Sequence, residues 1–374
     1  MGKVNRNRLY ETFQELVAID SPSLGEKKMG AFVRKRLNTL GLSVVEDNAG
    51  KQLGGTSGNL YCRWNGLLPN TAPLLFSAHL DTVEPSKGKR AILLQDGTIQ
   101  GGGNAVLGAD DLAGVAVILE ALQTVMERGL LHREVELLFL VAEEIYSGGA
   151  LCFDYGMLHA KEAYVLDLSG PVGSCAYRAP TILAFTAAFK GRAAHAGFAP
   201  ETGANAIAAA ARAISSTKQG HVGTELTVNI GMIQGGAAQN IVSDTCIVHG
   251  EIRSYQHERA LEMYNAIQAC FEEAGDAFGV TVSFSHRFGC IAYEIPKGAA
   301  VVSRAERACK ACGIPFQLIQ TFGGSDNNHF VQRGLCGVVL ACGMEDCHSV
   351  KERSNLDELV RAAEIVVRLM IDPV

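Results

Sequence analysis

The chain has 374 residues, of which 48% are hydrophobic and 19% are charged, and this length favours two packed domains over a single core. Its net charge of −6 argues against nucleic acid as the main partner, because binding phosphates requires a basic surface. No run of apolar residues is long enough for a membrane span, so we expect no membrane partner.

The beginning of the chain and its cysteines indicate a cellular compartment. The first residues, MGKVNRNRLYETF, lack the apolar core of a signal peptide, so we expect a reducing cytoplasm. Most of the 11 cysteines lie in apolar stretches, where they act as small hydrophobic residues. Cys309 and Cys312 have CxxC spacing, but they lie within a helical pattern and no second pair follows. We therefore interpret them as structural.

The first half of the chain alternates helices and strands. Apolar residues at helical spacing predict one helix over 6–20, and a second helix that ends near Leu40, before Gly41. The further expected elements are strands near 58–64, 73–79 and 91–95, a helix over 113–126, and strands over 134–141 and 163–168. This alternation predicts an α/β fold whose central mixed sheet is flanked by helices.

The pattern changes near residue 180. The expected elements are strands over 182–189, 225–233, 241–253 and 281–286, with helices over 205–216 and 257–274. Their order, β-α-β-β-α-β, is typical of a ferredoxin-like unit. After Pro296 the α/β pattern returns and ends in a helix from Leu356. We therefore predict a discontinuous catalytic domain (1–179 and 293–374) that is interrupted by a smaller α+β domain (180–292).

Acids and histidines recur where strands are expected to end, in segments 78–81, 107–111, 141–144, 165–167 and 347–348. Sites in open α/β sheets form beyond the carboxyl ends of the strands. Zinc takes His and carboxylate ligands, so the five segments together indicate a metal centre. Because residues i and i+2 of a strand face the same side, Asp81 can orient His79. Glu143 and Glu144 diverge, so one can bind metal while the other reaches the attacking water.

A resemblance to a known family follows from motifs in chain order. SAHLDTVEP, LGADDLAG, VAEEIYSGG, YVLDLSG, GRAAHAGFAPETGANAI, GGAAQNIVSD, EIRS, TFGGSDNNHF and CHSVKER resemble the motif series of the di-zinc amidohydrolases. This family includes peptidase T, carboxypeptidase G, aminoacylase and succinyl-diaminopimelate desuccinylase. The motifs are most similar to the peptidase T-like branch, and they cover nearly the whole chain.

The resemblance implies two divalent metal ions per subunit, with Zn²⁺ expected and Co²⁺ or Mn²⁺ as alternatives. By this resemblance, His79 and Asp167 hold one ion, while Glu144 and His348 hold the other. Asp110 then bridges the two ions.

The resemblance also implies which residues act on the substrate. Glu143 is expected to be the general base, and Asp81 to be the catalytic partner that orients His79. The inserted domain is expected to be a lid that also forms a homodimer. The expected substrate-binding residues are His195, Asn240, Arg253, Gly324 and Ser325.

Alternatives and departures limit what the resemblance implies. By itself the pair Asp110 and Asp111 is typical of a helix start, and we expect one of them to cap a helix. Leu112 stands where many relatives have lysine, and Ile145 and Tyr146 replace a glycine-led turn. We predict an exopeptidase that acts on short peptides, namely a tripeptide aminopeptidase. An N-acyl amino acid amidohydrolase or a carboxypeptidase remains the alternative.

Overall fold

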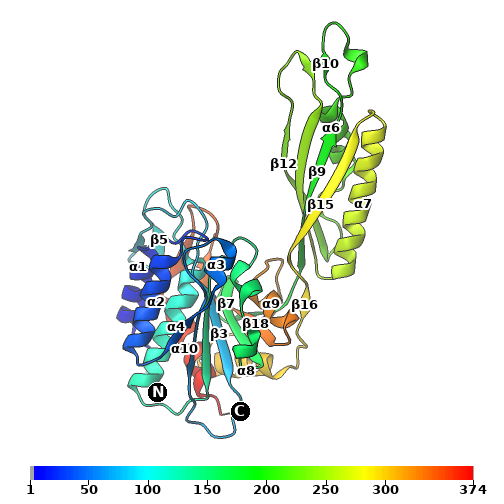
Figure 1. Ribbon diagram of the computed structural model, residues 1–374. Helices are drawn as coiled ribbons and strands as arrows, with labels where there is room; N and C mark the ends of the chain where they lie inside the picture. Colours follow the sequence, from blue (N-terminus) through cyan, green and yellow to red (C-terminus); the bar gives the residue numbers. More distant parts are fainter. Residues whose placement is uncertain (1–3, 374) are drawn as a thin grey trace. The chain divides into compact units, whose positions relative to one another are not determined.

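The computed structural model describes residues 4–373, which form two compact units (Figure 1). The first unit runs to Arg178 and resumes over 294–320 and from Ser325. The second unit comprises residues 179–293 and the short loop 321–324. The second unit is therefore an insertion in the first, with one additional loop contributed from later in the chain.

The first unit contains a mixed twelve-stranded sheet. Its strands are β1 (Val44–Glu46), β2 (Leu60–Trp64), β3 (Leu74–His79), β4 (Ala91–Leu93), β5 (Thr98–Gly101), β6 (Val135–Leu140), β7 (Glu162–Ser169), β8 (Ser174–Ala179), β16 (Tyr293–Glu294), β17 (Gln317–Gln320), β18 (Cys336–Glu345) and β19 (Arg353–Asn355). The neighbours β6, β3, β7 and β18 are parallel, whereas β1, β2, β19, β5 and β4 pair antiparallel toward the two edges. The predicted α/β fold with a central mixed sheet is confirmed.

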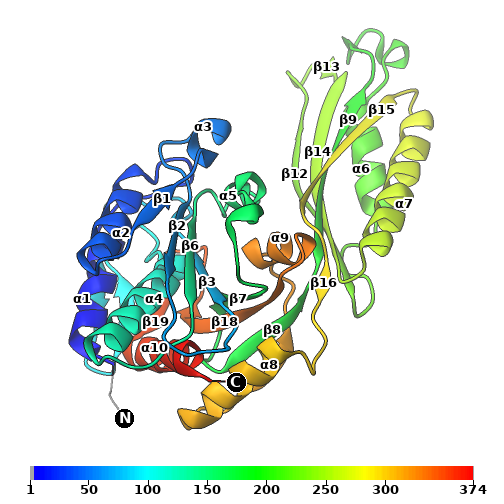
Figure 2. The same ribbon diagram turned by 60° about the horizontal axis from the view of Figure 1, so that its bottom comes forward.

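Helices cover both faces of this sheet. They are α1 (Arg6–Val17), α2 (Lys27–Thr39), α3 (Ala49–Leu53), α4 (Ala109–Glu127), α5 (Gly148–Cys152), α8 (Ala300–Ala311), α9 (Asp326–Gln332) and α10 (Leu356–Ile371). Helices α1, α4 and α10 pack against one another on one face, while α5 and α9 lie together on the other (Figure 2). Because both faces are covered, every residue of β3 and β6 is buried. Among the described residues, no helix is long and apolar enough to cross a membrane.

The second unit has a five-stranded antiparallel sheet in the order β11-β12-β14-β9-β15. Its elements are β9 (Thr181–Lys190), β10 (Ala194–His195), α6 (Ala206–Ser216), β11 (Gly220–His221), β12 (Leu226–Gly235), β13 (Ile241–Val242), β14 (Thr245–Ser254), α7 (His257–Asp276) and β15 (Thr281–Cys290). Helices α6 and α7 pack on this sheet around a shared apolar core. The predicted ferredoxin-like arrangement is confirmed.

One predicted strand of the second unit is wrong in detail. The expected strand over 241–253 is two strands, because the chain turns at Ser243 and Asp244. The carbonyl oxygens of these two residues accept hydrogen bonds from the N–H groups of Ala206 and Gly191. The short β13 thereby pairs with β10 and leaves the main sheet.

Candidate active site

His79 is the last residue of β3 and is completely surrounded by protein. Its backbone N–H donates to Asp111 Oδ2 at 3.1 Å, and its ring Nδ1 lies 2.9 Å from the backbone oxygen of Asp81. The carboxylate of Asp81 is further away, at 3.4 Å from the same nitrogen. These contacts fix the ring and direct Nε2 toward Asp110, whose Oδ1 lies 3.2 Å away.

Asp110 lies in the first turn of α4, so the prediction that this pair of aspartates follows a strand is wrong. The helix begins after Gly108, so neither aspartate is its first cap, but Asp111 accepts a hydrogen bond of the capping type from the N–H of Gly114 at 3.2 Å, beyond the irregular first turn. The buried carboxylate of Glu352 accepts the N–H groups of Gly108 (2.6 Å) and Asp110 (2.9 Å). These bonds hold the start of α4 in place and thereby orient the Asp110 side chain.

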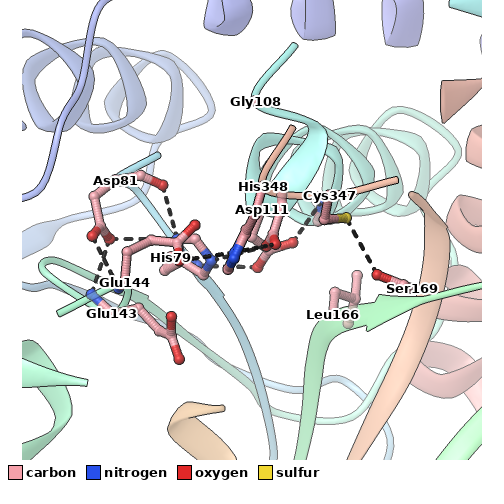
Figure 3. A network of polar contacts seen from close by, with 12 residues as sticks. His79, Asp81, Gly108, Asp111, Glu143, Glu144, Leu166, Ser169, Cys347 and His348 are labelled. Carbon is pink, nitrogen blue, oxygen red and sulfur yellow. Dashed lines mark hydrogen bonds and ion pairs between the residues drawn. The ribbon is translucent and has the colours of Figure 1, made fainter. Parts of the chain in front are cut away.

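The carboxylate of Asp110 lies between two histidines, His79 and His348, and both of these are labelled in Figure 3. Its Oδ1 faces His79, and its Oδ2 lies 3.2 Å from His348 Nε2. The same nitrogen of His348 is 3.0 Å from Glu144 Oε2. Hydrogen bonds to Asp110 and Glu144 raise the pKa of His348 to about 10. Burial acts to raise the pKa of Asp110, but its contacts with His348 and His79 outweigh burial and lower that pKa.

Among the described residues, three groups of side chains place possible ligand atoms within 4.8 Å of one another, and two of these groups contain His79. One group is His79, Asp111 and Asp167, and the other is His79, Asp110 and Glu144. Burial, followed by the charge of Asp110, raises the pKa of Asp167 well above its usual range. The second oxygen of Glu144 is buried without a hydrogen-bond partner. Buried carboxylates with so little neutralising charge fit divalent cations.

Glu143 and Glu144 are adjacent but reach different partners. Glu144 contacts His348, whereas Glu143 Oε1 accepts the hydroxyl of Ser147 at 3.3 Å. Burial and the charge of Asp326 act to raise the pKa of Glu143, which lies well above its usual range. Burial also raises the pKa of Asp326 to about 7. A raised pKa makes a carboxylate a stronger proton acceptor, which suits a group that takes up a proton during a reaction.

The candidate substrate residues lie mostly in the second unit. His195 is exposed on β10, where its Nδ1 accepts the N–H groups of Gly197 (3.1 Å) and Phe198 (3.2 Å). Because Nδ1 is an acceptor, the ring proton belongs on Nε2, which can donate to a ligand. Asn240 lies nearby, since its backbone oxygen accepts the N–H of Ala196 at 3.0 Å.

Of the remaining candidate substrate residues, Arg253 and Ser325 form hydrogen bonds within the protein. Arg253 donates from Nε to Glu251 (2.6 Å) and from a terminal nitrogen to the backbone oxygen of Phe322 (2.7 Å). Gly324 belongs to the loop that packs with the second unit. Ser325 caps α9 through its hydroxyl, which accepts the N–H of Asn327 at 3.3 Å. The structure thus gathers the candidate metal ligands around His79 in the first unit, while Gly324 and the other second-unit candidates belong to a separate unit.

Glu352 and Asp326 both lie in the motifs that carry the resemblance, but the resemblance implies no role for Glu352 and places Asp326 only in a loop beside the substrate. Glu352 follows His348 by four residues, and Asp326 follows Ser325. Their closeness in sequence to candidate site residues was the only indication of a role that the sequence offered. Their actual contacts, with the start of α4 and with the surroundings of Glu143, depend on tertiary structure.

Comparisons with known proteins match both units. Residues 59–177 match peptidase family M28, and residues 179–278 match a peptidase dimerisation domain. The chain is 35% identical to the uncharacterized protein YqjE of Bacillus subtilis, over 98% of each chain. It is 34% identical to the solved aminopeptidase PepT of Bacillus cereus, with a TM-score of 0.91 and 100% of both chains covered. A tripeptidase structure from Staphylococcus aureus is 33% identical, with a TM-score of 0.95 and coverage of 100% and 99%.

The fold, the clustered acids and histidines, and these relatives define the class as a peptide-hydrolysing enzyme of the metallopeptidase type. More specifically, the chain belongs to the peptidase T-like family of metallopeptidases. The family predicted from the motif series is therefore confirmed.

Proposed function

We propose that the protein is an exopeptidase that removes the N-terminal residue of short peptides, with tripeptides as the expected class. The observation that carries this proposal is the Asp110 carboxylate, which presents one oxygen to His79 and the other to His348. This is the arrangement that a carboxylate shared by two ions requires. The relatives described as PepT and a tripeptidase support the substrate class.

Two divalent ions, with Zn²⁺ expected, would be held by His79, Asp110, Asp167, Glu144 and His348. Imidazole and carboxylate are donors that zinc accepts, and Co²⁺ or Mn²⁺ suit the same set. When bound, such ions supply Lewis acidity that polarises a carbonyl group and makes water more acidic. Asp111 also has a carboxylate oxygen within 4.8 Å of a His79 ring nitrogen, so it is a second candidate ligand beside Asp110. We assign Asp111 to stabilising the start of α4 because its oxygens already accept two N–H groups.

Glu143 is the proposed general base. No ion pair with a cationic side chain is seen for it among the described residues, and burial raises its pKa, which makes its carboxylate a stronger proton acceptor. Glu143 would take a proton from the attacking water and pass it to the amine that leaves. Asp81 supports this step indirectly, because it holds both the His79 ring and the backbone of Glu143.

The second unit would supply the substrate-binding groups. His195, with its proton on Nε2, would donate to the oxyanion that develops on the scissile carbonyl. Asn240, Arg253, Gly324 and Ser325 are proposed to bind the peptide. A homodimer through this unit is also proposed, on the match to a peptidase dimerisation domain. His195 could then act in its own subunit or across the dimer.

The test combines metal analysis with a substrate panel. We expect two divalent ions per chain, and hydrolysis of tripeptides with a free amine. N-blocked peptides and acyl amino acids should be left intact. Preferential cleavage of the blocked compounds would overturn the aminopeptidase proposal in favour of an amidohydrolase or carboxypeptidase.

Replacing the proposed base gives a sharper prediction. Glu143→Ala should retain the metal content of the wild type and lose at least about 100-fold in kcat, because the variant lacks the carboxylate that takes the proton. Metal content measured on the same sample serves as the control. Activity close to that of the wild type would exclude Glu143 as the base.

A further inference from the structure

The turn that carries Glu143 and Glu144 is held by side chains from distant parts of the chain. It follows β6 and spans residues 141–144. Each of its four backbone N–H groups donates to a side-chain oxygen. The pairs are Val141 with Asn59 (3.1 Å), Ala142 with Glu26 (3.0 Å), Glu143 with Asp81 Oδ1 (3.0 Å) and Glu144 with Asp81 Oδ2 (3.1 Å).

The backbone of this turn has an unusual conformation. Ala142 has φ 56°, in the left-handed region that residues other than glycine seldom adopt. Its side chain is buried, so an N–H group without a partner here would be costly. The bond to Glu26 satisfies this N–H in the left-handed conformation. The carbonyl of Ala142 is also bound, since it accepts the N–H of Gly148 at 2.8 Å.

The two unassigned acceptors are themselves fixed. Asn59 is fully buried, and its amide nitrogen donates to Asp47 (2.7 Å) and to the backbone oxygen of Gly149 (2.9 Å). These two bonds determine which end of the amide faces Val141. Glu26 is also fully buried at the start of α2, and the oxygen that binds Ala142 also accepts the N–H of Leu24 at 2.8 Å. Neither acceptor can turn away without losing these partners.

We propose that Glu26 and Asn59 are positioning residues, which set the direction in which Glu143 and Glu144 leave the backbone. The inference rests on the proposed function, in which Glu143 is the base and Glu144 binds metal. Rotation of the peptide at Ala142 would re-aim both side chains together. Small misplacements of catalytic groups reduce rates strongly, so the effect should be visible in kcat and in metal affinity.

The test compares Glu26→Ala with Glu26→Gln. Glu26→Ala removes the acceptor, so we expect kcat to fall roughly 10–100-fold and KM to stay within about threefold. Its affinity for metal, measured by competition with a chelator, should fall roughly tenfold because Glu144 is displaced. Glu26→Gln keeps an oxygen acceptor and should remain within about threefold of the wild type in both measurements. If Glu26→Ala does not fold, Glu26→Asp, which withdraws the acceptor by one methylene, should show the same direction of change.

Glu136 offers a matched control at the other end of β6. It is also a fully buried carboxylate, and it accepts the N–H groups of His159 (3.0 Å) and Ala160 (2.8 Å). Glu136→Ala should lower the Tm but leave kcat and metal affinity unchanged. The proposal is overturned if Glu26→Ala behaves in the same way as this control.

The two proposals can fail separately. If the wild type binds metal but hydrolyses none of the peptides, the proposed function fails. Metal affinity still decides the role of Glu26, since it needs no substrate. If the wild type is active and Glu26→Ala keeps both kcat and metal affinity, the positioning role alone is wrong.

Discussion

At the scale of single residues, Gly149 is a position where even a methyl group would meet fixed atoms. A methyl group at Gly149 would overlap with the backbone oxygen of Val141 and with Oδ1 of Asn59. A methyl at Gly148 would instead meet the flexible side chain of Leu53 at 3.2 Å. The two glycines are neighbours in α5, so they form a natural pair for comparison.

We expect Gly149→Ala to destabilise the protein by about 2–3 kcal/mol, because the clash is with backbone and with a side chain that cannot move. Gly148→Ala should cost no more than about 1 kcal/mol. Urea unfolding of both variants and the wild type measures these free energies. Equal stability of the two variants would show that the contacts of Gly149 are less rigid than the structure indicates.

At this scale, candidate site residues could be predicted where a short motif contains a residue type that binds metal. His79, Asp110 and Glu144 are of types that bind metal, and the structure brings them within 4.8 Å. Glu26 gave no such signal, because the run Gly-Glu-Lys-Lys is typical of the exposed start of a helix. Its buried bond to Ala142 joins residues more than one hundred positions apart, and only the tertiary fold brings them together.

At the scale of elements, α4 shows how a helix start can be fixed from outside the helix. The first turn is not ideal, since Asp110 has φ −80° and ψ 102°, which is extended rather than helical. Glu352 receives two N–H groups at this point, and Asp111 receives a third from Gly114. The apolar pattern predicted the body of the helix from residue 113, but not its irregular beginning.

We therefore expect Glu352→Gln to weaken metal binding. The amide group replaces one of two acceptor oxygens, so a donor faces the N–H of Gly108 or Asp110. The affinity for metal should fall roughly 10–100-fold, as for other changes behind a metal ligand, and chelator competition measures it. Glu358→Gln is the control, since Glu358 binds the N–H of Val172 and is not in contact with Asp110. Equal affinities in the two variants would contradict the role of Glu352.

At the scale of the whole molecule, the order of elements was sufficient to predict an insertion. The β-α-β-β-α-β order specified the antiparallel sheet of the second unit, because few topologies accommodate it. The loop 321–324 could not be assigned in this way. It lies between β17 and α9 in the chain, yet Phe322 packs on Tyr255 with ring centroids 4.5 Å apart and accepts a hydrogen bond from Arg253. Such pairing depends on side chains, which element order does not describe.

The free energy of unfolding of the metal-free protein should fall as the pH rises. Burial raises the pKa of Glu26 and Asp326 to about 7, from ordinary values of 4.5 and 3.8. Between these values the folded protein binds protons that the unfolded chain has released, so stability falls as pH rises. His348 acts in the same direction, because its pKa is raised from 6.5 to about 10. The lowered pKa of Asp81 acts only below its ordinary value of 3.8, outside this range.

We therefore expect the Tm of the protein in excess chelator to be lower at pH 8 than at pH 5.5, by on the order of 2–5 °C. Divalent ions compete with protons for the same carboxylates and imidazoles, so the stabilisation they give should increase over this range. Calorimetry with and without added Zn²⁺ measures both trends. If the metal-free Tm rises with pH instead, protons do not take the place of the ions in this cluster. The excess of negative charge around Asp110 would then have to be neutralised by another cation.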